Sequence, residues 1–150
     1  GLHHDERGFP TGDPRRAEAL VRRLQRKLEL AAERFSRFVA EGTEDAEVLV
    51  VAYGSVARAA LQAVRLARQE GVRAGLLRLL TLWPFPAAPV RRTVERARHV
   101  LVPEMNLGQL VGEVERAVAG RAPVRSLTKA SGELVHPDEV LAAIREAAAR

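Results

Sequence analysis

The spacing of the apolar residues changes near Gly42, which divides the chain into two parts. Before Gly42, apolar residues recur three or four positions apart, at Leu20, Leu24, Leu28, Ala31, Phe35 and Phe38. This spacing predicts one long amphipathic helix that is capped by Asp13, has Pro14 at its first position and runs to about Glu41. Residues 1–13 are polar and rich in turn-forming residues, so we expect an extended segment ahead of the helix.

After Gly42, short apolar runs alternate with helical patterns. The expected strands cover residues 47–53, 74–80, 99–102 and 124–129. The expected helices cover residues 54–70, 90–97, 107–119 and the end of the chain from about 137. Strands that alternate with helices pair in parallel through right-handed crossovers, and this arrangement covers both faces of the sheet.

The predicted fold class is therefore α/β, a three-layer α/β/α arrangement around an open, mainly parallel sheet, preceded by a long N-terminal helix. We place the linker and the long helix in residues 1–42 and the α/β domain in residues 43–150. Because the long helix lies outside the alternation, we expect it to pack beside the sheet or to bridge to another segment.

The composition excludes several kinds of site. The chain has 150 residues, enough for one domain with a core, and 47% of them are hydrophobic. Cysteine is absent, which excludes disulfides, thiol nucleophiles, zinc-thiolate sites and iron–sulfur ligands. No apolar run is long enough for a membrane span and no signal-peptide pattern opens the chain, so we expect a cytoplasmic protein without a membrane partner. Because the first residue is Gly rather than Met, we expect a fragment or a trimmed chain.

The charge is strongly basic, with a formal net charge of +5 and a sequence pI of about 10.8. Lys occurs only at positions 27 and 129, and this preference for Arg favours a thermophilic source. A basic chain could bind nucleic acid. Here the arginines are scattered among acidic residues, and aromatic residues make up only 4%, too few for a stacking platform. We therefore expect solvated helix faces and no nucleic-acid partner.

Open α/β sheets bind ligands at the C-terminal ends of their strands, where three loops of this chain lie. The first loop contains Tyr53, Gly54 and Ser55. Gly54 permits a tight turn, Ser55 can cap the next helix through its hydroxyl, and free N–H groups at a helix start attract anions. A plain strand-to-helix turn explains the same residues, and no GxGxxG or GKS/GKT motif indicates a nucleotide site.

The second loop, residues 81–89, holds Trp83, Pro84 and Phe85. Aromatic side chains between prolines either anchor an interface or pack under the sheet edge as core, and the sequence favours neither.

The third loop lies in the stretch VPEMNLGQL, residues 102–110. Glu104 is a candidate for a catalytic acid, a ligand contact or a helix-start residue. A lone carboxylate without a second acid is poor evidence for acid–base catalysis. Asn106 is a good N-cap and Gly108 allows a close backbone approach, so helix capping explains much of this stretch.

The histidines predict no metal site and no catalytic set. The sequence HHDE at residues 3–6 places adjacent ligands near the chain end, and no later Cys/His cluster completes them. His99 opens an expected strand and His136 precedes Pro137, and neither has an evident partner. We expect an α/β domain without a self-sufficient catalytic set.

Four segments, taken in order, resemble the C-terminal part of the alpha subunit of 2-oxoacid:ferredoxin oxidoreductases, above all the 2-oxoglutarate type. These segments are HDERGFPTGDP, AYGS, LLTLWPFP and VPEMNLGQL. The resemblance covers nearly the whole chain. It implies that residues 1–14 form the linker that follows the pyrimidine-binding domain and that the remainder is a transketolase C-terminal-like domain.

The resemblance also implies a role. The whole enzyme decarboxylates a 2-oxo acid on thiamine diphosphate with magnesium, passes electrons through iron–sulfur clusters to ferredoxin and forms an acyl-CoA. No cofactor is expected in this chain, which would serve in assembly and in shaping the region near the active site. The expected partners are the thiamine- and cluster-binding domains or subunits, ferredoxin through the complex, and a second copy in a homodimer.

Carried over by motif, the residues implied to contact ligands or neighbours are Tyr53, Gly54, Ser55, Pro84, Phe85, Glu104, Asn106 and Gln109. Glu104 and Asn106 would form a strand-to-helix corner that faces a neighbouring domain or subunit. The catalytic and cofactor-binding halves of the alpha subunit are absent upstream, which fits both a C-terminal fragment and a naturally split subunit. Two alternatives remain: a stand-alone module that binds a small anion, and the equivalent domain of another thiamine-dependent enzyme.

Overall fold

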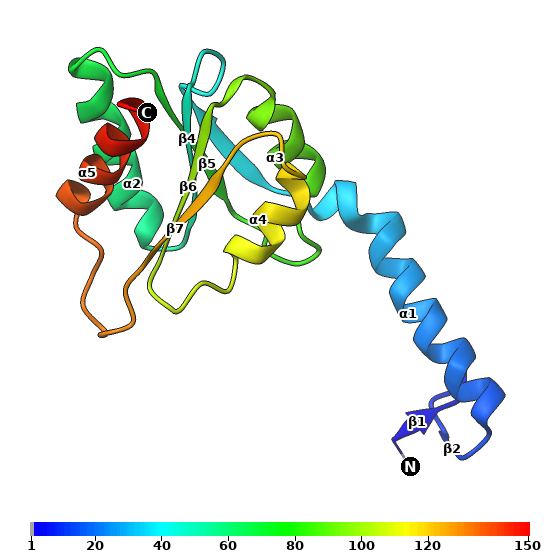
Figure 1. Ribbon diagram of the computed structural model, residues 1–150. Coiled ribbons are helices and arrows are strands. Elements are labelled where there is room, and N and C mark those ends of the chain that lie inside the picture. Colours follow the sequence, from blue (N-terminus) through cyan, green and yellow to red (C-terminus); the bar gives the residue numbers. More distant parts are fainter. Residues whose placement is uncertain (1) are drawn as a thin grey trace.

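The computed structural model describes residues 2–150 and contains one five-stranded sheet (Figure 1). In spatial order the strands are β3 (Phe38–Glu41), β5 (Ala74–Leu79), β4 (Val48–Tyr53), β6 (His99–Glu104) and β7 (Val124–Thr128). Strands β5, β4, β6 and β7 run parallel, and β3 pairs antiparallel with β5. Helices lie on both faces of the sheet, so the predicted three-layer α/β/α class with a mainly parallel sheet is confirmed.

Alternate residues of the central strands face two separate cores. The helices that cover these cores are α2 (Val56–Gln69), α3 (Ala87–Thr93), α4 (Val111–Val118) and α5 (Pro137–Ala148). Val48 and Val50 of β4 lie in the core under α2 and α5, whereas Leu49 and Val51 lie in the core under α3 and α4. All four side chains are fully buried, which explains why β4 is a continuous apolar run without polar alternation.

The N-terminal residues form a two-stranded hairpin followed by a long helix. β1 (His3–His4) pairs antiparallel with β2 (Pro10–Thr11), so this segment folds back on itself rather than extending as expected. Helix α1 (Pro14–Phe35) begins as predicted, because Asp13 Oδ1 accepts a hydrogen bond of 2.9 Å from the N–H of Arg15. Figure 1 shows α1 projecting away from the sheet, with the N-terminus at its far end.

The predicted end of the first helix is wrong. Helix α1 ends at Phe35 instead of Glu41, and residues 38–41 form the edge strand β3. The backbone of β3 pairs with residues 76–79 of β5, and the N–H of Leu80 donates to the carbonyl of Arg37 at 2.9 Å. Phe38 continues the helical spacing, so periodicity could not separate the two elements, and the long-range strand pairing decides between them.

The largest other boundary differences from the sequence prediction concern three elements. Strand β6 continues to Glu104 rather than ending at residue 102, because its last residues still pair with β7. The helix expected from residue 107 begins only at Val111. The helix expected over residues 90–97 begins at Ala87 and passes into a short 3-10 helix, η1 (Val94–Arg96).

Candidate functional site

The candidate site lies between the C-terminal ends of β4 and β6. The chain proceeds from β4 to β5 on one side of the sheet and later to β6 on the other side, so the strand order reverses at this point. Open α/β sheets bind ligands in the crevice at such a switch point. The ladder between β4 and β6 ends at the pair Val50 and Leu101. Beyond this pair, β4 still pairs with β5 and β6 with β7, but β4 and β6 no longer pair with each other.

Glu104, the last residue of β6, occupies this position. Its side chain is 0% exposed, and it is the one buried polar or charged residue among residues 2–150. Its Oε2 accepts a hydrogen bond of 2.8 Å from the N–H of Leu110, and its Oε1 accepts one of 3.1 Å from the N–H of Val111. The carboxylate thus satisfies two otherwise free N–H groups at the start of α4 and complements the helix dipole. Both oxygens therefore have structural partners.

Tyr53, the last residue of β4, reaches the same carboxylate. Its hydroxyl donates to Glu104 Oε2 at 3.4 Å and accepts a hydrogen bond of 3.0 Å from Asn106 Nδ2. Burial raises the pKa of Tyr53, and the negative charge of Glu104 raises it further, against a lowering contribution from Asn106. The phenol therefore stays protonated at neutral pH, which suits a donor to a carboxylate. At the switch point, the side chains of Tyr53, Glu104 and Asn106 thus bond to one another.

The predicted role of Asn106 as a helix N-cap is wrong. Its Oδ1 accepts hydrogen bonds from the N–H groups of Gly108 at 2.8 Å and Gln109 at 3.0 Å, within a non-helical turn ahead of α4. The turn requires Gly108, whose φ is +95° and whose position would set an added Cβ 3.2 Å from Val111 Cγ1. Capping of α4 falls to Glu104, six residues before Leu110 in the chain.

The predicted cap at Ser55 is also wrong. Ser55 has helical backbone angles and makes no side-chain cap; its hydroxyl instead lies 4.0 Å from the sulfur of Met105. Gly54 does form the expected tight turn, with φ of +57° and open space where a Cβ would lie. Residues 54 and 55 are exposed, so this turn lies at the surface beside the switch point.

The loop after β5 divides its two aromatic residues between core and surface. The peptide bond between Trp83 and Pro84 is cis. Phe85 is half-buried and packs against the core under α3 and α4, as Tyr53 also does. Trp83 is 68% exposed. Phe85 therefore takes the core alternative, whereas Trp83 lies at the surface, where the interface alternative stays a prediction.

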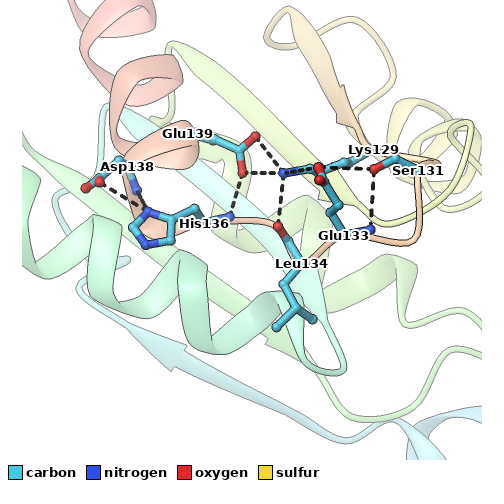
Figure 2. A network of polar contacts seen from close by, with 7 residues as sticks. All are labelled: Lys129, Ser131, Glu133, Leu134, His136, Asp138 and Glu139. Carbon is cyan, nitrogen blue, oxygen red and sulfur yellow. Dashed lines mark hydrogen bonds and ion pairs between the residues drawn. The ribbon is translucent and has the colours of Figure 1, made fainter.

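A second polar network, which the sequence analysis missed, follows β7 at the same end of the sheet (Figure 2). Lys129 Nζ donates to the carbonyl of Leu134 at 3.0 Å and contacts both oxygens of Glu139, at 3.1 and 3.2 Å. Glu139 also accepts a hydrogen bond of 2.6 Å from the N–H of His136 and so completes a capping box at the start of α5. The sequence signal was present, because a Glu three residues after a cap position predicts this motif. The Lys129 backbone N–H joins the two networks by donating to the Glu104 carbonyl at 2.9 Å.

The N-terminal sequence HHDE has a structural role in the hairpin. Asp5 Oδ1 accepts hydrogen bonds from the N–H groups of Arg7 and Phe9, at 2.9 and 3.0 Å, and so shapes the turn between β1 and β2. Within residues 2–150, no three His, Asp or Glu side chains lie together in a way that could hold a metal ion. None of the helices described for these residues is both long and apolar enough to span a membrane.

Comparisons with known proteins give the family context. Residues 46–140 match the family model of pyruvate:ferredoxin oxidoreductase core domain II. The chain is 46% identical to the 2-oxoglutarate synthase subunit KorA of Methanothermobacter thermautotrophicus over 94% of its own length and 38% of that subunit. It is 32% identical to subunit alpha of 2-oxoacid:ferredoxin oxidoreductase 2 of Aeropyrum pernix, over 97% of its length and 23% of that subunit.

A solved structure shares the fold over nearly the whole chain. The 2-oxoglutarate:ferredoxin oxidoreductase of Magnetococcus marinus, determined with 2-oxoglutarate, coenzyme A and succinyl-CoA bound, matches 98% of this chain with a TM-score of 0.83 and 26% identity. The match covers 26% of that chain, so the present chain spans well under half the length of these relatives. The family model matches more than half of the chain, and the chain therefore belongs to the pyruvate:ferredoxin oxidoreductase core domain II family.

Proposed function

We propose that this chain is the C-terminal domain of the alpha subunit of a 2-oxoglutarate-type 2-oxoacid:ferredoxin oxidoreductase. In the complex, it supports assembly and shapes the region beside the active site. The names of the relatives support the substrate class, and their greater length supports a role as one part of a larger enzyme. Thiamine diphosphate, magnesium, iron–sulfur clusters and coenzyme A are assigned to other parts of the complex. For the clusters the reason is chemical, because iron–sulfur ligation requires thiolates and the chain has no cysteine.

The observation that carries this proposal is the uncovered apolar stripe of α1. Leu20 is the only buried residue of this 22-residue helix. Three large apolar side chains along this stripe or at its margin are exposed in the chain alone: Val21, Leu24 and Phe35. Leu30 is also exposed, but it lies on another side of the helix. Isolated helices draw little stability from propensity, and most helices are stabilised by packing their apolar face. A neighbouring domain or subunit of the oxidoreductase that covers this stripe accounts for both its composition and its projection from the body.

The loops at the C-terminal edge of the sheet form the second part of the proposed contact surface. The residues assigned to it are Tyr53, Gly54, Ser55, Pro84, Phe85, Glu104, Asn106 and Gln109. Glu104 acts there through the backbone that it holds, and not as a proton-transfer group, because both of its oxygens already accept hydrogen bonds. Leu107, at the tip of the turn that Glu104 and Asn106 fix, is 86% exposed and suits a contact with a neighbour.

Reconstitution with the remaining subunits tests the assembly role. The double substitution Leu24→Gln and Leu28→Gln makes the stripe polar without changing the net charge. The matched control, Arg26→Gln and Glu33→Gln, introduces the same residues on the opposite face and also keeps the net charge. We expect the stripe variant to lose incorporation into the complex, measured by mass photometry, together with 2-oxoglutarate-dependent ferredoxin reduction, while the control retains both. Normal assembly of the stripe variant would refute the proposal.

A further inference from the structure

Strand β3 leaves one edge of the sheet open. Within residues 2–150, β3 pairs with β5 on one side and with no strand on the other. Phe38 is 38% exposed, Val39 is 47% exposed, and Ala40 is also exposed. Natural edge strands commonly carry lysine, proline or a bulge that prevents pairing with another chain. β3 contains neither lysine nor proline, and its continuous register with β5 shows that it has no bulge.

The hydrogen-bond pattern shows which backbone groups of β3 face outward. The N–H of Leu80 donates to the carbonyl of Arg37 at the end of the ladder, so the backbone groups of Arg37 face β5. The N–H of Arg37 donates on the same side, to Thr81 Oγ1 at 3.3 Å. Because hydrogen-bonded and non-hydrogen-bonded pairs alternate, Val39 also bonds toward β5. The N–H and C=O groups of Phe38 and Ala40 therefore point away from the sheet, where they can bond to a further strand.

These outward groups match a second copy of the same strand. In an antiparallel pair centred on Val39, Phe38 lies opposite Ala40 of the second copy, and Ala40 lies opposite its Phe38. The backbone N–H and C=O groups of all four residues point outward from their own sheets, so each pair exchanges two N–H···O=C bonds and the two copies share four. A shift by one residue would set outward groups against inward ones and lose these bonds.

The same register also matches charges. It places Arg37 opposite Glu41 of the second copy, and Glu41 opposite its Arg37, at close non-hydrogen-bonded positions. Arg37 makes no ion pair in the described part of the chain. Glu41 Oε1 accepts from Arg65 Nη2 at 2.8 Å, while its Oε2 makes no hydrogen bond within residues 2–150. The other open edge, β7, offers no comparable match, because Arg125 there is already paired with Glu146.

We propose that β3 pairs with β3 of a second copy of this chain, antiparallel about a two-fold axis at Val39, so that two five-stranded sheets become one continuous sheet. Figure 1 shows α1 leaving the body at the start of β3. In the antiparallel pair, the two α1 helices would thus leave at opposite ends of the paired strands. The proposed pairing does not depend on the function proposed above.

Sedimentation velocity over a concentration series tests the pairing with the 150-residue chain, whose α/β body buries both cores without α1. We expect a concentration-dependent monomer–dimer equilibrium. Ala40→Pro removes one outward N–H and no bond to β5, so the dimer should be lost while circular dichroism and the melting temperature show an intact fold. Ala40→Ser keeps the N–H and should dimerise like the original chain. A monomer at every concentration, or a dimer unaffected by Ala40→Pro in a folded chain, would overturn the proposal.

A charge exchange tests the register. Arg37→Glu alone and Glu41→Arg alone each place like charges opposite one another at both positions, and we expect each to weaken self-association about tenfold. An equimolar mixture of the two variants restores opposite charges at both positions, so heterodimers should form as readily as the original dimer. The control Arg58→Glu makes the same charge change on α2 and should leave association unchanged. A mixture that associates no better than either variant would refute this register.

Discussion

Replacement of Glu104 by glutamine should destabilise the domain, because it puts a hydrogen-bond donor where the structure needs an acceptor. The side chain keeps its shape, but one acceptor oxygen becomes an NH2 group. If the amide oxygen stays with Leu110 and Tyr53, the NH2 faces the N–H of Val111, and the two donors have no acceptor between them. An unsatisfied buried donor costs about 1–3 kcal/mol. Loss of the charge at the helix start adds about 0.3–1 kcal/mol.

The expected loss for Glu104→Gln is therefore about 1.3–4 kcal/mol in the free energy of unfolding. For a domain of this size, the melting temperature should fall by roughly 3–16 °C. Urea denaturation followed by circular dichroism measures the free energy, and amide hydrogen exchange locates the loss. Exchange should accelerate at Leu110 and Val111 before it does in β4. Tyr53→Phe is the matched control, because it removes one hydroxyl and leaves both backbone N–H groups bonded to the carboxylate.

Two results would refute this account of Glu104. A variant within about 0.5 kcal/mol of the original chain, the usual effect of a neutral surface substitution, would show that the carboxylate does not hold α4. In the reconstituted oxidoreductase, a large loss of single-turnover rate with assembly intact would show that Glu104 transfers a proton. The proposed structural role predicts the reverse, with assembly affected more than the chemical step.

Two further predictions concern the neighbouring loops. The N–H of His136 and the ammonium of Lys129 hold the pKa of Glu139 below its usual value. The ionised Glu139 therefore stabilises the fold fully at pH values above its usual pKa, and this stabilisation is lost as the pH falls through the lowered pKa. Glu139→Gln should remove this part of the acid dependence in urea titrations at several pH values, and an unchanged pH profile would contradict the prediction. Gly108→Ala should lower the free energy of unfolding by about 2–3 kcal/mol, and Gly54→Ala by only about 1 kcal/mol, because both need positive φ but a Cβ at Gly108 also crowds Val111. Equal denaturation midpoints for the two alanine variants would show that backbone strain alone matters.

The parallel core could be predicted because its strands are buried on both faces. β4, β5 and β6 are short runs dominated by Val and Leu, and helices with clear apolar stripes lie between them, so alternation and parallel pairing follow from the sequence. The same alternation brought Tyr53 and Glu104 to one edge of the sheet, where the structure indeed joins them. The start of α1 and the turn at Gly54 were also predictable, because a cap and a positive φ are local features.

Contacts between distant residues determined the remaining features. Residues 38–41 fit a helix or a strand equally well by spacing, and pairing with residues 76–79 made them β3. The start of α4 could not be read from residues 107–110, because the carboxylate that caps it belongs to the preceding strand. Local sequence thus specifies most of the helices and strands, since propensity and periodicity act over a few residues, but it does not specify β3. Which groups satisfy the buried N–H donors, and which strand edge stays open, depends on neighbours that only the folded chain brings together.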